Sequence, residues 1–322
     1  MRNVCLVSRR VLNVFAFIIG VLGVFFLLKA LYLTELENTE LIYRIRGPVP
    51  ADDHRLIDLL REEYLIPPSN KPYNISKDSD QVYTIYAKED TWRFIHWQLQ
   101  MLFDQAHRGF FVEAGALDGV FISNTLWLER NQGWTGLLVE PNKESFQHLQ
   151  SKHRRSWTSN TCLSTEPYPK QTIQVNLKSA PRRGITPVSW NHRGSSHELG
   201  FNVNLSNPTF FAVADKSYAV VQCFPLISYL LALNVSVVDF LSLDVQGSER
   251  LILRSIPWDL VRIRVIIVEI YEEELDVDFK LYMESKGYIL VNENLLPKVH
   301  DQIYIRIEEE ELLRKLKYFV IV

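Results

Sequence analysis

The sequence predicts an α/β fold, a doubly wound and mostly parallel sheet, preceded by one N-terminal transmembrane helix. Short apolar runs alternate with helical segments from residue 110 onward, which is typical of parallel strands joined by helical crossovers. The last two strand-like runs, residues 288–291 and 303–307, have only a loop between them, which predicts an antiparallel edge pair. An apolar run at residues 11–33 predicts the membrane helix.

The apolar run at residues 11–33 is interpreted as a retained signal anchor. Three arginines precede it and no acidic residue occurs before Glu35, so the positive-inside rule places the N-terminus in the cytosol and the rest in a lumen. A cleaved signal peptide is the alternative, but the run is longer than a usual signal-peptide core and no A-x-A-like site follows. We therefore expect a single-pass type II membrane protein of the endoplasmic reticulum, Golgi or endosome.

Two further features agree with a lumenal domain. Asn74, Asn204 and Asn234 each begin an N-x-[ST] glycosylation sequon. The part of the chain after the anchor holds two cysteines, Cys162 and Cys223, and in an oxidising compartment an even pair favours one disulfide. Two free buried thiols are the alternative for the cysteines, and sequons also arise by chance.

Length and charge bound the organisation of the chain. The 322 residues carry a formal net charge of −3, so no basic field points to nucleic acid. We divide the chain into a cytosolic end (1–10), the anchor (11–33), a stem with a helical segment (34–90) and one lumenal domain (91–322). The short basic run at residues 152–155 is interpreted as a solvated helix end favoured by the helix dipole.

Residues 110–142 organise the predicted domain as strand, glycine turn, helix and strand. Residues 110–112 form a short apolar run, as a strand buried on both faces should. Small residues follow at 113–119, where the backbone can turn sharply. The next strand, 137–139, ends at Glu140, and ligands bind at the carboxyl ends of strands in open parallel sheets.

The chemistry of this turn suits a nucleoside. The two oxygens of Glu140 can accept hydrogen bonds from two vicinal ribose hydroxyls. Gly115 and Gly119 would leave room for the rest of the ligand, and Glu113 and Asp118 would line the turn. Neither G-x-x-x-x-G-K-[ST] nor G-x-G-x-x-G is present, so no phosphate cradle is expected. S-adenosylmethionine fits this description; an ordinary β-α-β unit with a tight turn is the alternative.

The remaining elements follow from periodicity and from turn residues. Helices are expected at 52–64, from Asp90 onward, and at 143–153, 226–233, 248–254 and 278–286, with strands at 157–164, 237–243 and 261–270 and an exposed terminal helix. Residues 166–215 lack clean periodicity and are expected to form a long loop that covers the ligand face. His192 and His197 in this loop lack the partner ligands of a metal site, so no metal is expected.

Three acids are predicted at the carboxyl ends of strands: Glu140, Asp244 and Glu269. Their convergence at one sheet edge would provide a ligand site. Asp244 and Glu269 are the predicted catalytic residues, because an acid facing the acceptor can orient or deprotonate a hydroxyl group during methyl transfer. For each acid the alternative is structural, namely capping the next helix, and Glu249 is assigned to that role.

Two ordered blocks resemble a known family. The turn Glu113-Ala-Gly-Ala-Leu-Asp-Gly119, followed by Ser123-Asn-Thr125 and by Trp134-x-Gly-Leu-Leu-x-Glu-Pro141, is similar to the opening of the FkbM-type methyltransferase domain, and most of all to its Star-like branch. Cys223-Phe-Pro-Leu226 and residues 238–249 match a second block. The resemblance implies a Rossmann-like methyltransferase fold, S-adenosylmethionine as cofactor and O-methyl transfer.

One departure from the family pattern concerns residues 244–247. FkbM-type domains that resemble active enzymes carry Asp-x-Glu-Gly there, whereas this chain has Asp244-Val245-Gln246-Gly247. Glutamine keeps the shape of glutamate and loses its charge and proton-acceptor role. The Star-like resemblance instead implies a binding role in the transport of membrane-bound growth-factor precursors from the endoplasmic reticulum to the Golgi and endosomes, which serves signalling by the epidermal growth factor receptor.

Two alternatives remain at this point. The first is an active S-adenosylmethionine-dependent O-methyltransferase acting on a lumenal glycan, lipid or small molecule. The second is a glycosyltransferase, because Asp276-Val277-Asp278 has the D-x-D form that holds a metal and a nucleotide sugar. Capping of the helix that follows explains this motif better.

Overall fold

The computed structural model divides the chain into two compact units, residues 1–46 and 47–322. It describes residues 2–44, 47–75, 90–105, 108–178, 196–200, 215–271, 277–296 and 299–317.

The first unit is dominated by one long helix, α1 (Arg2–Arg44). Within it, Asn13–Glu35 has a mean hydropathy of 2.6 and is long and apolar enough to cross a membrane. None of this stretch is buried by other parts of the protein. An apolar N-terminal helix of this kind is a candidate signal anchor, although a signal sequence would have the same properties.

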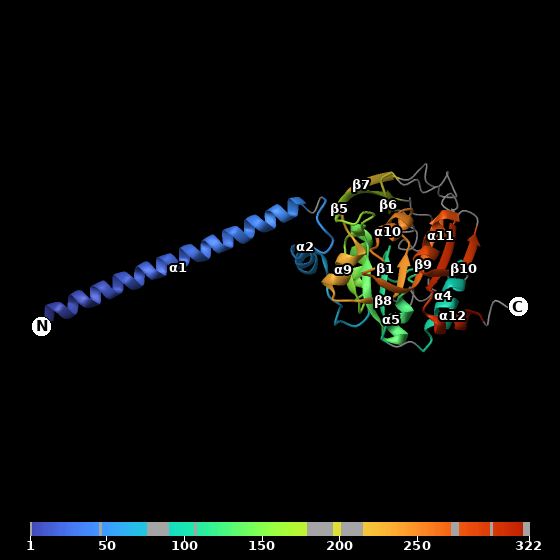
Figure 1. Ribbon diagram of the computed structural model, residues 1–322, viewed down its shortest axis with the longest axis horizontal. Coiled ribbons are helices and arrows are strands. Elements are labelled where there is room, and N and C mark those ends of the chain that lie inside the picture. The colour runs from blue at the N-terminus through green and yellow to red at the C-terminus, as the bar shows by residue number, and fades with distance from the viewer. Residues whose placement is uncertain are drawn as a thin grey trace. The chain divides into compact units, whose positions relative to one another are not determined.

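A seven-stranded sheet forms the centre of the second unit and confirms the predicted α/β fold class (Figure 1). The strand order is β10-β11-β9-β8-β1-β2-β3. The strands are β1 (Phe110–Ala114), β2 (Thr135–Val139), β3 (Trp157–Ser159), β8 (Val237–Leu243), β9 (Arg262–Tyr271), β10 (Tyr288–Leu296) and β11 (Val299–Arg306). All neighbours are parallel except β11, which runs antiparallel to both β9 and β10. The predicted antiparallel pair is therefore present, and β11 lies between β9 and β10.

Helices cover both faces of this sheet. One hydrophobic core joins the sheet to α4 (Asp90–Phe103), α5 (Leu126–Gln132), α6 (Lys143–Ser151) and α12 (Glu310–Lys317). Ile303 and Ile305 of β11 belong to that core, whereas Tyr304 between them contacts Phe279 of α11 (Val277–Ser285). Successive strand residues point to opposite faces, so α11 lies on the other face. The helices α9 (Leu226–Ala232) and α10 (Glu249–Ser255) follow the same α/β alternation.

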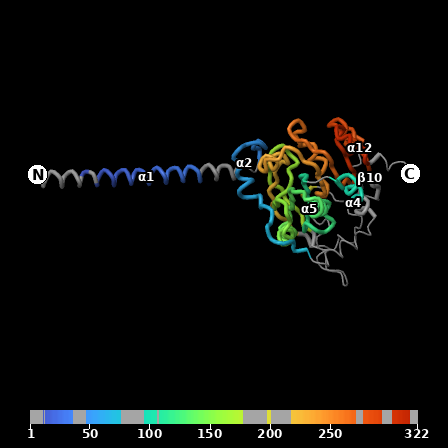
Figure 2. The backbone as a smooth tube through the Cα atoms, turned by 90° about the horizontal axis from the view of Figure 1, so that it is seen from below, coloured from blue at the N-terminus to red at the C-terminus, as the bar shows by residue number. Residues whose placement is uncertain are grey.

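The terminal helix is less exposed than the sequence indicated. In Figures 1 and 2, α12 lies beside α4, and Lys315 Nζ donates a hydrogen bond of 3.0 Å to the carbonyl of Leu102. Leu312 is buried in the core shared with α4. The acidic start of α12 suggested an exposed helix, but Leu312 and Leu313 pack on the domain.

A second, four-stranded sheet occupies part of the predicted long loop and corrects that prediction. Its strand order is β4-β7-β5-β6. The strands are β4 (Cys162–Leu163), β5 (Lys170–Lys178), β6 (Ser196–Glu198) and β7 (Asp215–Phe224). The β5 segment does alternate, with Ile173, Val175 and Leu177 two residues apart, but its partner β7 is about 40 residues away and leaves no local signal. His192 and most of the segment between β5 and β7 lie outside the described residues.

Cys162 and Cys223 face each other across β4 and β7 and form a disulfide with a Cα–Cα distance of 4.3 Å. Two of the three sequon asparagines, Asn74 and Asn234, are exposed on the described surface. Asn204 lies outside the described residues. Glycosylation at these positions stays a prediction.

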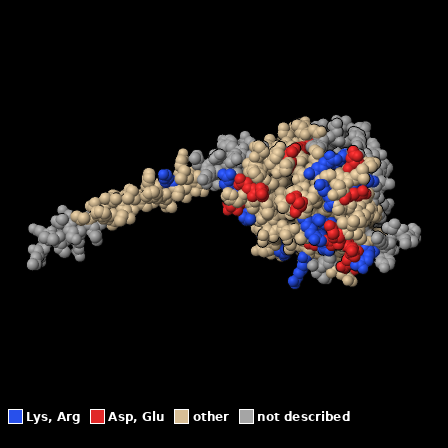
Figure 3. All heavy atoms as spheres, viewed as in Figure 1, with Lys and Arg blue, Asp and Glu red and all other residues tan. Residues whose placement is uncertain are grey.

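Residues 47–75 pack with the domain rather than apart from it, because the compact unit begins at Gly47. The predicted helix at 52–64 is an α-helix, α2 (His54–Leu59), that continues as a π-helical turn, η1 (Leu60–Tyr64). Leu56 and Leu60 are fully buried, and the segment contacts α9. Among the described residues on the face shown in Figure 3, acidic and basic side chains are interspersed.

Candidate functional site

The carboxyl edge of the main sheet brings together the three predicted acids. Glu140 follows β2, Asp244 follows β8, and Glu269 lies near the end of β9. The strands β9, β8, β1 and β2 are consecutive neighbours in the sheet. The charge of Asp244 acts on both Glu140 and Glu269 and raises the pKa of each, after the larger effect of burial. The acids therefore form one electrostatic group.

Glu140 is the most deeply placed member, with 4% of its surface exposed. Its Oε2 accepts a hydrogen bond from the backbone N–H of Leu117, and its Oε1 accepts one from the N–H of Asn142, each at 2.8 Å. Burial raises the pKa of Glu140 to about 8, against the lowering effect of these two hydrogen bonds. Each oxygen has two lone pairs, so the carboxylate keeps the capacity to accept two more hydrogen bonds.

The glycine turn after β1 is held by close packing. Gly115 has φ +84° and Gly119 has φ +74°, both in the region that favours glycine. A Cβ on Gly115 would lie 1.8 Å from the carbonyl oxygen of Asp244, and one on Gly119 would lie 2.3 Å from Leu149 Cδ1. Protein atoms thus fill the space on the Cβ side of both glycines, where the sequence interpretation expected room for a ligand. Contact of either glycine with a cofactor stays a prediction.

Two of the predicted cofactor-binding acids, Glu113 and Asp118, accept hydrogen bonds from residues of the turn itself. Glu113 accepts hydrogen bonds from Ser123 Oγ, from Thr125 Oγ1 and from the backbone N–H of Asn124. Asp118 Oδ1 accepts the backbone N–H groups of Val120 and Phe121 at 2.9 and 2.8 Å. Both side chains are buried. Their contacts fix the backbone that faces Glu140; a direct role of either acid in cofactor binding stays a prediction.

Gln246 connects the two predicted catalytic acids. Its Nε2 donates to Asp244 Oδ1 at 2.6 Å and to Glu269 Oε2 at 3.2 Å. Glu249 lies in the first turn of α10 and holds the preceding turn by accepting the backbone N–H groups of Val245 and Gly247 at 2.7 and 2.9 Å. Its role is structural, as assigned, but it acts on the turn rather than as a helix cap. A glutamate at position 246 could not donate these hydrogen bonds when ionised. The glutamine therefore acts as a bridge between two carboxyl groups.

Asp301 joins this group and was not found from the sequence. It lies on β11 directly opposite Glu269 of β9. Burial and the charge of Asp244 raise the pKa of Asp301 to about 7, and burial with Asp244 and Asp301 raises the pKa of Glu269 well above its usual value. The sequence indicates a terminal strand near Asp301, but neither the pairing of β11 with β9 nor its register can be read from one sequence.

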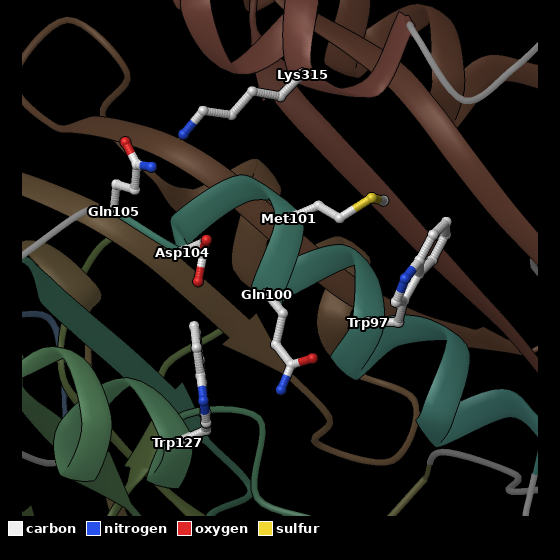
Figure 4. Close-up of a pocket in the computed structure, with 7 residues that line it drawn as sticks. All are labelled: Trp97, Gln100, Met101, Asp104, Gln105, Trp127 and Lys315. Carbon is white, nitrogen blue, oxygen red and sulfur yellow. The ribbon is translucent and has the colours of Figure 1, made fainter.

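A separate cavity of about 780 Å³ opens between α4, α5 and α12 (Figure 4). In this view Trp127 and Lys315 lie on opposite sides of α4. It is lined by Trp97, Gln100, Met101, Asp104, Gln105, Trp127 and Lys315. None of the predicted site acids lines this cavity.

Within the described ranges, no group of three His, Cys, Asp or Glu side chains is arranged to hold a metal ion. Asp276 of the D-x-D motif lies outside the described residues. Val277 and Asp278, which open α11, are exposed.

Several solved structures are similar to this chain at low identity. The N-terminal domain of human METTL16 is 11% identical, over 79% of this chain and 80% of that chain, with a TM-score of 0.37. Human methyltransferase 10 domain containing protein is 12% identical, over 81% and 100%, with a TM-score of 0.36. The methyltransferase FkbM from Methylobacillus flagellatus KT is 13% identical, over 62% and 43%, with a TM-score of 0.35. The architecture rests on the sheet order above rather than on these values.

A comparison with curated proteins gave no match. The family comparison is decisive, because residues 113–290 match the methyltransferase FkbM domain. This range begins at Glu113 in β1 and includes Glu140, Asp244 and Glu269. It spans more than half of the chain, and the protein therefore belongs to the methyltransferase FkbM domain family.

Proposed function

We propose that the domain binds S-adenosylmethionine at the carboxyl edge of β1, β2, β8 and β9 and transfers its methyl group to a hydroxyl group of a lumenal glycan, lipid or small molecule. The observation that carries this proposal is the environment of Glu140. Its two oxygens each accept one backbone N–H and retain one further acceptor position, which suits the two hydroxyls of a ribose.

One group of residues would bind the cofactor and a second group would face the methyl acceptor. The cofactor supplies a methyl group on a positively charged sulfur. Glu140 would accept hydrogen bonds from the ribose, and the turn at residues 113–125 would hold the backbone against it. Asp244 and Glu269, joined by Gln246, would face the acceptor and take its hydroxyl proton. The raised pKa of Glu269 makes its ionised carboxylate a stronger proton acceptor.

Calorimetric titration of S-adenosylmethionine into the full-length protein in detergent micelles tests the proposal. We expect saturable binding by the wild type and loss of at least about 100-fold in affinity for Glu140→Ala, because the variant loses two hydrogen bonds with the ribose in a buried site. Glu144→Ala is the control, since Glu144 is an exposed acid four residues away. A folded wild type that binds no cofactor, or a Glu140→Ala variant that binds as well as the wild type, would refute this site.

A second candidate is the Star-like role, in which the domain binds membrane-bound growth-factor precursors and promotes their export from the endoplasmic reticulum. Gln246 supports it, because a neutral amide stands where family members that resemble active enzymes carry a glutamate. Export of a tagged precursor would be measured in cells that lack this protein and then receive the wild type or Glu140→Ala. Restored export with both forms would favour a binding role without cofactor, whereas export that never depended on the protein would exclude it.

A further inference from the structure

Arg154 is a buried charged residue that none of the roles above uses. It follows α6 and is 2% exposed. The sequence interpretation of residues 152–155 as a solvated basic run is therefore wrong for this position. A buried guanidinium persists only when its N–H groups have acceptors, so its partners indicate what it does.

The acceptors of Arg154 come from both ends of one turn. Its Nη1 donates to the carbonyl of Gly119 and to Ser123 Oγ, and its Nη2 donates to Thr125 Oγ1 at 3.1 Å. Its Nε donates to Glu129 Oε1 of α5 at 3.0 Å. The planar fork of arginine suits this set of fixed acceptors, and the point charge of a lysine does not.

Ser123 and Thr125 also connect Arg154 to β1. The same two hydroxyl groups that accept from Arg154 donate to Glu113. Burial raises the pKa of Glu113, and the Arg154 guanidinium opposes this effect most strongly. The turn thus lies between a buried acid on one side and a buried base on the other.

Glu129 completes the arrangement on the far side of the guanidinium. Its Oε1 also accepts the backbone N–H of Arg155 at 2.8 Å, and its Oε2 accepts Ser156 Oγ at 2.5 Å. Arg154 is therefore fixed to α5 and to the chain leading into β3. The Arg154 side chain is therefore held in one position while it donates hydrogen bonds to the turn at residues 119–125.

We propose that Arg154 is the positioning residue that sets the conformation of the cofactor turn. The turn carries Leu117, whose backbone N–H donates to Glu140, so a shift of the turn would change the orientation of the carboxylate that receives the ribose. Arg154 acts through Gly119, Ser123 and Thr125 and contacts no ligand. This inference rests on the proposed function of the site and adds a residue outside the resembling motifs.

The test must separate positioning from stability, because Arg154→Met leaves Glu129 buried without its partner and lowers the melting temperature. The double variant Arg154→Met/Glu129→Gln removes both charges, and the glutamine can still accept from Arg155 N–H and donate to Ser156. We expect its melting temperature to recover toward the wild-type value. Its affinity for S-adenosylmethionine, measured by calorimetry on full-length protein in micelles well below that temperature, stays about tenfold weaker than wild type.

Arg264→Met is the control, since Arg264 is also an ion-paired arginine but lies at the opposite edge of the sheet. We expect a lower melting temperature and wild-type affinity for the cofactor. Affinity that recovers with stability in the double variant overturns the positioning role while leaving the proposed function intact. A folded wild-type protein that binds no S-adenosylmethionine overturns both.

Discussion

The two edges of the main sheet use acidic residues in opposite ways. At the amino edge Asp239 and Glu309 have cationic partners. Arg264 pairs with Asp239 at 3.0 Å and with Glu309 at 2.7 Å, and Arg262 pairs with Glu309 at 2.9 Å. Asp239 also accepts the backbone N–H of Phe110, the first residue of β1. Hydrogen bonds from the two arginines hold the pKa of Glu309 below its usual value despite burial.

At the carboxyl edge the acids face one another instead. Glu140, Asp244, Glu269 and Asp301 form no ion pair with a basic residue in the part of the chain that the structure describes. Burial and mutual repulsion raise the pKa values of Glu140, Glu269 and Asp301. The difference separates two uses of the same residue type. Acids that pair with arginines stabilise the fold, whereas acids without an ion pair among the described residues leave negative charge that a bound cation can neutralise.

Among the substitutions at the two sheet edges, the largest effect on stability is expected from Arg264→Met. The variant leaves Asp239 and Glu309 without their shared cation, and because Arg264 is about a third exposed, solvent screens part of the loss. We expect the free energy of unfolding to fall by about 1–3 kcal/mol in denaturant titrations. Arg314→Met, at an exposed position of α12, should change it by less than about 0.5 kcal/mol. Equal losses for the two variants would contradict the assignment of the amino edge to stability.

The carboxyl edge should instead make stability depend on pH. The pKa of Glu140 rises from 4.5 to about 8 and that of Asp301 from 3.8 to about 7 on folding. Groups with raised pKa values contribute most below their unfolded values, and that contribution is lost as pH rises through the folded values. The free energy of unfolding should therefore decrease between pH 5 and pH 8. Glu140→Gln should make this decrease smaller; an identical pH profile in both proteins would show that Glu140 does not titrate in this way.

The next prediction compares two ligands that differ in charge. S-adenosylmethionine carries a positive sulfur, whereas its demethylated product, S-adenosylhomocysteine, has a neutral one. At pH 8 we expect the protein to bind S-adenosylmethionine about tenfold more tightly than S-adenosylhomocysteine, because the carboxylates attract the positive sulfur. At pH 6 more of the acids are protonated, so the ratio of the two affinities should be smaller. Parallel calorimetric titrations at the two pH values give the ratio. A ratio that does not grow with pH would mean that these carboxylates do not act on the sulfur.

The smallest effect is expected for Gln246→Glu, which creates the Asp-x-Glu-Gly sequence. The variant replaces an amide that donates to Asp244 and Glu269 by another carboxyl group. We expect a loss of about 1 kcal/mol in unfolding free energy at pH 8 and almost none at pH 5, where protonation restores a donor. Gln246→Ala is the control, because it removes the bridge without adding charge. A loss that is the same at both pH values would point to packing rather than electrostatics.

Local patterns in the sequence were sufficient to predict the part of the fold that carries the site. The runs that became β1, β2, β8 and β9 are short, apolar and bounded by turns, so the acids that follow them could be placed at one edge. Their position depends on strand order, which the α/β alternation restricts strongly. This is why Glu140, Asp244 and Glu269 could be grouped before the structure was known.

The features that could not be predicted from the sequence depend on contacts between residues that are distant in the chain. The strand β5 alternates like any half-buried strand, but without β7 its pattern could not be told from a loop. Asp301 meets Glu269 only through the register of an antiparallel pair. Arg154 stands in a run of basic residues that resembles a solvated helix end, and only the fold places Glu129 and Thr125 around it.

The disulfide between Cys162 and Cys223 has a practical consequence for handling this protein. The two cysteines are 61 residues apart in the sequence and join β4 to β7, so the intervening segment is a covalently closed loop. A protease that cuts once between them leaves two fragments that remain joined. Such a preparation would migrate as one intact chain on a non-reducing gel and as two pieces after reduction, and a cut made outside the loop would release its fragment under both conditions.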